Sequence, residues 1–393
     1  GFLVDLFQAF FFKLFGVNWY AYILHSSIFN FIISFLTYKF FISLKIDKTK
    51  SLICTLSFAT LAYTISGTPF VDHHATFFLL ISTYFITYAI SEPKKKYLWP
   101  IIVFLLFLSF FSKQVPAAYA IIILGLIIFF LLMKKKDYDT IKVLASSLLT
   151  FTALLVLILI IFGIDFKEFY IQYFDYPRSI GSDRTTNLKF SFESIFNHYK
   201  FIIFPMFGIL IIKFRNKKNL NLTYDLKRNV NLLIIIGFSI SIIFHQLMTK
   251  NQIYIYFLIP ILFALLISYL NDIKFRFKKY FSLSLIFFLI LITLKYHYRY
   301  NETRKFHELE NVNLSEAIPA SNIDKSLTGL MWINPFFKKS PLEEITILNE
   351  AKVILEQTNY EIMVHTHYLF LDSITKKNLN YPNRSFTLDG ASM

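Results

Sequence analysis

Four groups of polar and ionisable side chains interrupt a chain in which 55% of the residues are hydrophobic, and they contain the residues that could do chemistry. The first group, Asp72, His73 and His74, follows Pro69 in a short connection between two apolar runs. A carboxylate beside imidazoles can bind a divalent cation such as Mg²⁺ or Mn²⁺, here through Asp72 and His74, or can orient a phosphate. The alternative is a solvated turn without chemistry, since a single Asp-His-His run is a weak signal.

The second group is Lys113, in a turn of a few residues from Ser112 to Gln114 between two apolar segments. An ammonium at the surface of a bilayer can bind the phosphate of a lipid. The neighbouring sequence offers no evident carboxylate, so the alternative is a lysine whose aliphatic stem lets it reach the outer headgroups.

The third group lies in a long loop expected over residues 164–200, where charged and aromatic residues alternate. Guanidinium groups suit phosphate or pyrophosphate, which makes Arg178 and Arg184 candidates for binding a donor phosphate. Ion pairs with Asp175 and Asp183 inside a folded loop would explain the same arginines. The tyrosines of this loop could stack on the face of a sugar: Tyr170, Tyr173 and Tyr176.

The fourth group straddles the ends of two apolar runs and could form a polar substrate-binding site at the membrane boundary. It consists of His245, Gln246, Lys250, Asn251 and Gln252. Five hydrogen-bonding side chains at one short turn exceed what a simple connection needs. The sequence contains no serine nucleophile elbow, Walker loop, dinucleotide fingerprint or zinc-protease helix.

The elements that must position these groups are apolar runs of a length that suits membrane helices. A hydrocarbon core of about 30 Å needs roughly 20 apolar residues per helix. About ten runs approach this length, and some are short enough to be tilted or partly re-entrant. They cover residues 21–41, 51–66, 75–90, 98–111, 115–133, 143–163, 199–212, 230–247, 253–270 and 281–294. The sequence therefore predicts an all-α polytopic bundle over residues 17–295.

The loops between these runs are rich in lysine and arginine at every second connection. The basic connections cover residues 45–50, 94–96, 134–136, 215–228 and 274–279. The positive-inside rule predicts that they are cytoplasmic. Asp72, Lys113, the loop 164–200 and Lys250 then face the other side, together with both ends of the chain.

The net charge of +15 would suggest nucleic-acid binding in a soluble protein. Here the excess lies mostly in the cytoplasmic loops, so we expect membrane lipid and no nucleic acid as a partner. The chain has one cysteine, Cys54, which excludes a disulfide framework or a thiolate metal site within it.

Both ends of the chain differ from the bundle. Residues 1–16 form an amphipathic pattern expected to lie in the membrane interface, as a remnant of a first outer loop. Residues 296–393 have the composition of a small extracytoplasmic α/β domain. In that domain Ser340 and Glu343 form a capping box for a helix that should run to about Gln357. A buried strand over 360–365 and a second helix over 369–377 should follow. We expect the sequence to be a fragment, cut at both ends.

The order of these features resembles the polytopic GT-C glycosyltransferases, which include the protein O-mannosyltransferases and the lipid A aminoarabinose transferases. The run Leu14-Phe15-Gly16, followed by Trp19, is similar to the interfacial helix and turn of that family. Asp72 falls where the family has an acidic residue in its second outer loop, and residues 112–114 are similar to its Thr-Lys-Gly turn. Residues 329–335, Gly-Leu-Met-Trp-Ile-Asn-Pro, would open the periplasmic domain.

The resemblance implies a multi-pass enzyme of the bacterial inner membrane. It would transfer a sugar from a polyprenyl-phosphate donor to a lipid or glycan acceptor on the periplasmic face, with inversion. Asp72, the candidate catalytic residue of this chain, would orient the donor or hold a metal ion, and His73 would contact the substrate. Lys113, Arg178 or Arg184 would meet the phosphate. Family members carry a catalytic acidic residue in the first outer loop, which would lie upstream of Gly1, so this chain would lack its general base.

Two other classes of membrane protein fit parts of the pattern. A transporter or flippase for a lipid-linked glycan would use similar basic clefts, although it should show polar residues near mid-membrane and broken helices. An O-antigen polymerase or ligase is also multi-spanning and has a large outer loop. An Asp-Glu pair in the first outer loop of the intact gene would favour the transferase.

Overall fold

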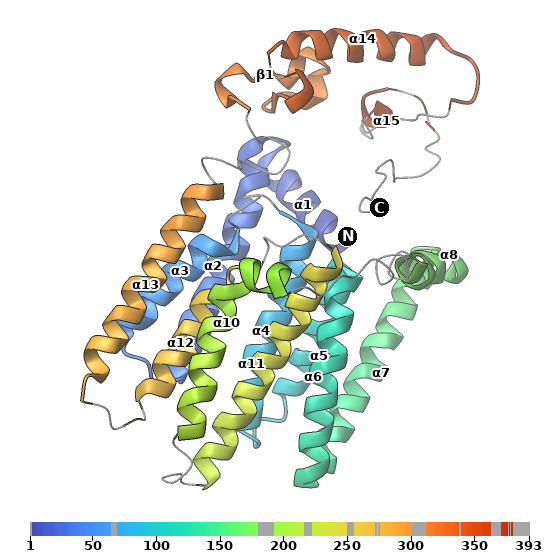
Figure 1. The fold of residues 1–393 in the computed structure, drawn as a ribbon. Helices are drawn as coiled ribbons and strands as arrows, with labels where there is room; N and C mark the ends of the chain where they lie inside the picture. Colours follow the sequence, from blue (N-terminus) through green and yellow to red (C-terminus); the bar gives the residue numbers. More distant parts are fainter. Residues whose placement is uncertain are drawn as a thin grey trace. The chain divides into compact units, whose positions relative to one another are not determined.

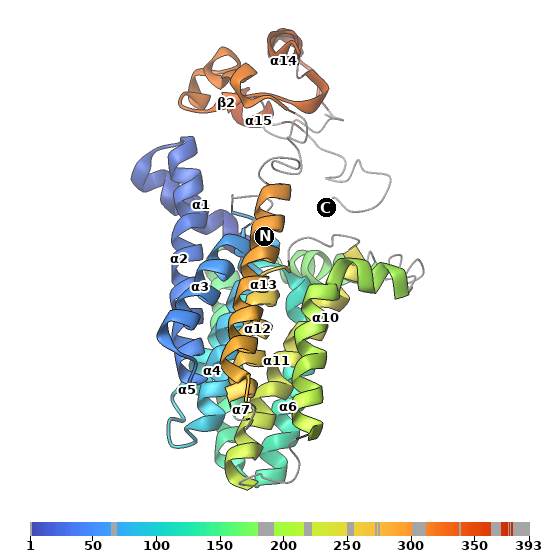
Figure 2. The ribbon, with the colours of Figure 1, turned by 60° about the vertical axis from the view of Figure 1, so that its left-hand side comes forward.

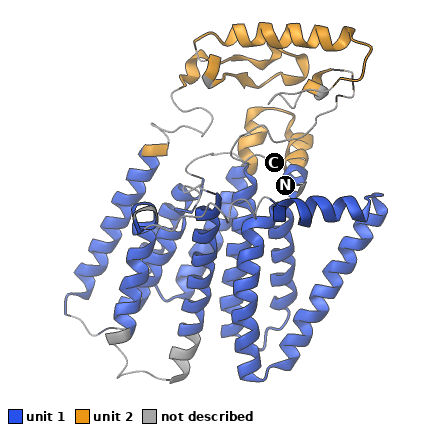
Figure 3. Ribbon diagram, turned by 45° about the vertical axis from the view of Figure 1, so that its right-hand side comes forward, with its two compact units in different colours: residues 1–7, 26–298 blue, residues 8–25, 299–393 orange. Residues whose placement is uncertain are grey.

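The computed structural model describes residues 2–63, 69–179, 192–215, 222–249, 255–271, 273, 276–300, 312–337, 339–362, 371–375, 377 and 379. The chain folds into two compact units. Unit 1 comprises residues 1–7 and 26–298, and unit 2 comprises residues 8–25 and 299–393 (Figure 3).

Unit 1 is a bundle of helices that run alongside one another (Figures 1 and 2). Each of the ten expected apolar runs overlaps one of its described helices. These are α2 (Trp19–Ser43), α3 (Lys48–Ala62), α4 (Val71–Ser91), α5 (Leu98–Ser112), α6 (Gln114–Lys135), α7 (Tyr138–Ile161), α10 (Phe192–Arg215), α11 (Leu222–Thr249), α12 (Leu258–Asn271) and α13 (Lys278–Tyr298).

Seven of the described helices, α2, α4, α6, α7, α10, α11 and α13, are long and apolar enough to cross a membrane. The chain therefore has the fold of a multi-pass membrane protein. The apolar helices α5 and α12 have 15 and 14 residues. At 1.5 Å per residue each is only about 22 Å long, less than the hydrocarbon thickness of about 30 Å. Every residue of α12 from Leu258 to Leu270 is buried, as expected for a helix that is hydrophobic on all sides.

Several hydrogen bonds gather the lysine-rich connections at one end of unit 1. The Lys50 ammonium, at the start of α3, donates to the Ser282 hydroxyl on α13 over 2.8 Å. Lys96, between α4 and α5, pairs with Asp139 on α7 at 2.9 Å. The Ser268 hydroxyl on α12 donates to the carbonyl at the end of α2, Leu44, over 2.8 Å. The connection between α5 and α6 lies at the opposite end (Figure 1).

The segment expected as one long loop, residues 164–200, contains regular structure, which corrects that prediction. The carboxylate of Asp165 accepts two backbone N–H groups and opens α8 (Phe166–Tyr170), which continues into a π-helix, η1 (Ile171–Asp175). Tyr173 and Phe174 of η1 pack on Phe111 and Phe110 of α5, with ring centroids 5.6 and 6.1 Å apart. The aromatic residues of this segment thus cover a helix end. Residues 192–200 already belong to α10, and residues 180–191 lie outside the described part.

Unit 2 contains most of α1 (Phe2–Phe15), the start of α2 and the C-terminal region. Gln8 on α1 bonds to the ring of His25 on α2 at 2.9 Å. Gly329 has a backbone φ of +93°, and a Cβ at this position would lie 3.2 Å from the Asn18 side chain. Only glycine tolerates both the dihedral and the approach, so the α1–α2 turn and the C-terminal region pack together there.

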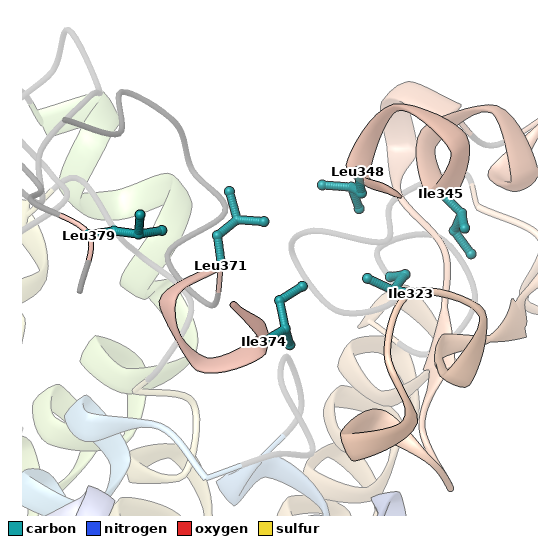
Figure 4. Packing of buried hydrophobic residues seen from close by; sticks show 6 residues of the cluster. All are labelled: Ile323, Ile345, Leu348, Leu371, Ile374 and Leu379. Carbon is teal, nitrogen blue, oxygen red and sulfur yellow. The ribbon is translucent and has the colours of Figure 1, made fainter. Parts of the chain in front are cut away.

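The C-terminal region has a two-stranded antiparallel sheet of β1 (Ile318–Pro319) and β2 (Met331–Trp332), followed by α14 (Pro341–Gln357) and α15 (Leu371–Ile374). Its described core consists of Ile323, Ile345, Leu348, Leu371, Ile374 and Leu379 (Figure 4). The buried carboxylate of Glu344 accepts the indole N–H of Trp332 at 2.9 Å and the amide of Asn334 at 2.8 Å. These two bonds tie β2 to the first turn of α14.

Three local expectations for this region need correction. The helix from Pro341 to Gln357 is confirmed, but the Ser340 side chain makes no capping bond, so the capping box is absent. Residues 360–362 form no strand. Tyr360 is 84% exposed, so its ring does not pack in the core. The second helix is the short α15, and residues 363–370 lie outside the described part.

Candidate functional site

The centre of the candidate site is Asp72, which the sequence placed in a connection and the structure places in the first turn of α4. Its side chain is only 7% exposed, so it is buried rather than part of a solvated turn. One carboxylate oxygen, Oδ2, lies 2.7 Å from the ammonium of Lys113. The other, Oδ1, lies 3.0 Å from Nε2 of His245. Both oxygens therefore accept a bond from a residue on another element, 41 and 173 positions away.

Lys113 is the cap residue between α5 and α6, in extended backbone conformation. The hydroxyl of Ser109 on α5 donates to the Ala75 carbonyl on α4 over 2.7 Å, which holds the end of α5 against the start of α4. The Lys113 side chain is 34% exposed. It is paired with a carboxylate and is not simply a lysine extended to the outer headgroups, which corrects that alternative.

His245 reaches the cluster from the last turns of α11, and it is almost fully buried. A carboxylate can only accept, so the Nε2–H of His245 is the donor. The helix is held against α6 by Tyr119, whose ring lies 5.0 Å from that of Phe244. Further along α11, a Cβ on Gly237 would come within 2.9 Å of Ile127 on α6, so the two helices approach closely there.

The two other histidines of the first group pack against aromatic rings of the bundle. The His73 ring stacks on Tyr63 with centroids 4.5 Å apart. His74 bonds through Nδ1 to the Phe70 carbonyl at 3.0 Å, and its ring lies 4.5 Å from that of Phe29. Successive helical residues point about 100° apart, which separates these three side chains. Both imidazoles are packed in the core of unit 1.

The Asp72 cluster does not fit a divalent cation. Within the described part of the chain, no group of three or more His, Cys, Asp or Glu side chains could hold a metal ion. The Lys113 ammonium occupies the position beside Oδ2 that a cation would take, and His74 makes its bond elsewhere. Binding of Mg²⁺ or Mn²⁺ elsewhere in the protein stays a prediction.

The remaining candidate residues are only partly joined to the cluster. Gln246 is buried next to His245, and its Oε1 has no hydrogen-bond partner among the described residues. Tyr176 and Arg178 lie on the helical residues 176–179 and are exposed, and no described contact links them to Asp72. Their segment follows η1, which covers the end of α5 immediately before Lys113. Arg184, Asp183, Lys250, Asn251 and Gln252 lie outside the described residues.

The pairing of Asp72 with Lys113 and His245 was missed by the sequence reasoning. One signal could have found the first contact: Asp72 begins one apolar run and Lys113 ends the next, so an antiparallel pair brings them to the same end. A lysine between two apolar runs also needs a counter-ion. The contact with His245 has no comparable signal.

The arrangement can receive an anion. Asp72 uses both oxygens within the cluster, so it is poorly placed to take a proton from a substrate. Lys113 has three N–H donors, of which the described contacts use one, and its side chain is the most exposed of the three. The cluster lies at the end of the bundle opposite the lysine-rich connections.

Comparisons with known proteins add no assignment. The chain matches no protein-family profile, no curated protein and no solved structure.

Proposed function

We propose that the chain is the membrane part of a glycosyltransferase that moves a sugar from a polyprenyl-phosphate donor to a lipid or glycan acceptor. The observation that carries the proposal is the partly exposed Lys113 ammonium, held by the buried Asp72 at the end of the bundle that is poor in lysine. By the positive-inside rule this end faces away from the cytoplasm. The enzyme would belong to a bacterial inner membrane, with the C-terminal region in the periplasm.

An ammonium at this place suits the proposed chemistry. In the transfer, the acceptor oxygen bonds to the anomeric carbon as the bond from that carbon to the phosphate oxygen breaks. The polyprenyl phosphate leaves with added negative charge, and a lysine ammonium in a partly dehydrated site stabilises that charge. The acceptor proton would go to an acidic residue outside the cluster, since Asp72 is occupied by Lys113 and His245. Arg178 would be a second phosphate contact, from the segment beyond η1.

The test is sugar transfer by the intact protein in membrane vesicles supplied with a labelled polyprenyl-phosphate sugar. Lys113→Ala should lower the rate about 100-fold, the loss that follows removal of one donor from a developing oxyanion. Lys113→Arg, which keeps the charge, should retain more activity than Lys113→Ala. The matched control is Lys94→Ala, an exposed lysine in the connection between α4 and α5 at the opposite end of the bundle.

A wild-type rate in Lys113→Ala would remove this residue from the site. Movement of the labelled lipid across the vesicle membrane with no glycosylated product would favour the transporter. Chain growth on a lipid-linked glycan would favour the polymerase.

A further inference from the structure

His245 has no role in the reaction outlined above, yet it is buried and contacts the centre of the site. It comes from α11, while Asp72 begins α4 and Lys113 joins α5 to α6. The three side chains form one chain of contacts, from Nε2 of His245 to Oδ1 of Asp72 at 3.0 Å, and from Oδ2 to Nζ of Lys113 at 2.7 Å. Of the three, Lys113 is the most accessible to a ligand.

We propose that His245 is a positioning residue, whose hydrogen bond to Asp72 fixes the carboxylate so that Lys113 presents its remaining N–H donors to a phosphate monoester. The inference rests on the proposed function, and it names the ligand class of the site as a phosphate monoester, the class of the polyprenyl phosphate that leaves in the transfer.

The physical reason is the rotational freedom of a carboxylate. The torsion at the end of an aspartate side chain is broad and roughly two-fold, so a single partner at Oδ2 does not define the orientation of the group. A second bond at Oδ1 defines it, and in an apolar environment such a bond is strong. Since α11 supplies this bond, the position of the Lys113 ammonium depends on how α11 packs against α4. Asp72 is then a positioning residue as well, and not a ligand of the donor.

The test measures Lys113 itself, so that it does not depend on sugar transfer. The intact protein in detergent is treated with an amine-reactive ester, and the rate of Lys113 acylation is followed by peptide mass spectrometry. The same rate is measured with dodecyl phosphate, a phosphate monoester, and with dodecyl maltoside as the uncharged counterpart. His245→Phe keeps a ring but removes the donor, whereas His245→Gln keeps an N–H donor. The control is His297→Phe, an exposed histidine on α13.

In the wild-type protein, dodecyl phosphate should slow acylation of Lys113 and dodecyl maltoside should not. In His245→Phe, acylation should become several-fold faster because the ammonium is less firmly held. The concentration of dodecyl phosphate that gives half protection should rise about tenfold or more, as expected for one lost hydrogen bond to a charged group. In His245→Gln, the rate of Lys113 acylation and the half-protecting concentration of dodecyl phosphate should both return most of the way to their wild-type values. Both quantities should equal those of the wild type in His297→Phe.

Acylation and protection in His245→Phe that equal those of His297→Phe would overturn the proposal. The same follows if His245→Gln is as impaired as His245→Phe, because that result indicates loss of ring packing rather than of a donor. A faster acylation in His245→Phe without any protection by dodecyl phosphate in the wild type would keep His245 as a positioning residue and would overturn the phosphate monoester as the ligand. Normal labelling behaviour in a protein that transfers no sugar would count against the proposed function alone.

Discussion

Replacing Lys113 by methionine should destabilise the bundle more than replacing Asp72 by asparagine, although both changes remove the same ion pair. The difference follows from the exposure of the two side chains, 34% for Lys113 and 7% for Asp72. In Lys113→Met the buried carboxylate keeps the bond from His245 but loses its counter-ion. In Asp72→Asn the ammonium can turn towards solvent, and the asparagine oxygen can still accept from His245.

The expected loss in the free energy of unfolding differs between the two variants. Removing one partner of a buried pair costs about 3–5 kcal/mol because the remaining charge is uncompensated. For Lys113→Met we expect about 3 kcal/mol, the lower end, since His245 still stabilises the carboxylate. For Asp72→Asn the residual charge is partly solvated, and the loss should be about 1 kcal/mol, as for an exposed pair. The double variant should cost about 1–2 kcal/mol, less than the sum of the single changes, because no unpaired charge remains.

The single cysteine provides the assay. Cys54 lies on α3 and is buried, so a thiol-reactive dye reports unfolding of unit 1. Equilibrium unfolding in mixed detergent micelles, followed by dye labelling, gives the free energy of unfolding for each variant. Lys94→Met serves as the control, because Lys94 is exposed and should change stability by less than about 0.5 kcal/mol.

Equal losses in the two single variants, or a larger loss in Asp72→Asn, would refute the reasoning from burial. Additive losses in the double variant would show that the two side chains do not interact in the membrane protein.

Three further experiments test the orientation and unit 2. In a cysteine-free background, Asp165→Cys should react with a membrane-impermeant maleimide from outside the cell, and Lys136→Cys only after the membrane is opened. Glu344→Ala should destabilise the C-terminal region by about 2 kcal/mol, because two half-buried donors, on Trp332 and Asn334, lose their acceptor, and hydrogen exchange over β2 should report it. The hydrogen bond from Lys352 holds the pKa of Asp324 below its usual range, so this pair stabilises the fold above the unfolded pKa of about 4 and is lost as the pH falls through the lower folded value. Protection from exchange in the wild type should therefore exceed that of Asp324→Asn at neutral pH and approach it in acid.

Each of these tests has an outcome that contradicts it. Labelling of both cysteines from the same side would reject the orientation. A loss in Glu343→Ala, an exposed neighbour on α14, as large as that in Glu344→Ala would assign the effect to helix propensity. A difference between wild type and Asp324→Asn that persists unchanged in acid would exclude the ion pair as its cause.

Much of the fold could be predicted because a bilayer imposes simple constraints on a helix. All ten expected apolar runs overlap described helices, and the contacts of Lys50 and Lys96 join basic connections that the charge pattern assigned to one side. The number of long spans was less predictable, since α12 is apolar enough to be membrane-spanning but is too short and is buried within the bundle. The sequence predicts a loop over residues 164–200, whereas α8 and η1 form within it and η1 packs on α5 through its aromatic side chains.

Local sequence determined that this chain is a multi-pass helical membrane protein whose C-terminal region differs in composition from the bundle, because the length and flanking charge of an apolar run can be read from consecutive residues. It also identified Asp72, Lys113 and His245 as polar side chains in unusual places. Only the tertiary structure decided that these three meet, while His73 and His74 turn into the core. A contact over 173 residues depends on how α11 packs against α4 and α6, and that packing is a property of the whole bundle.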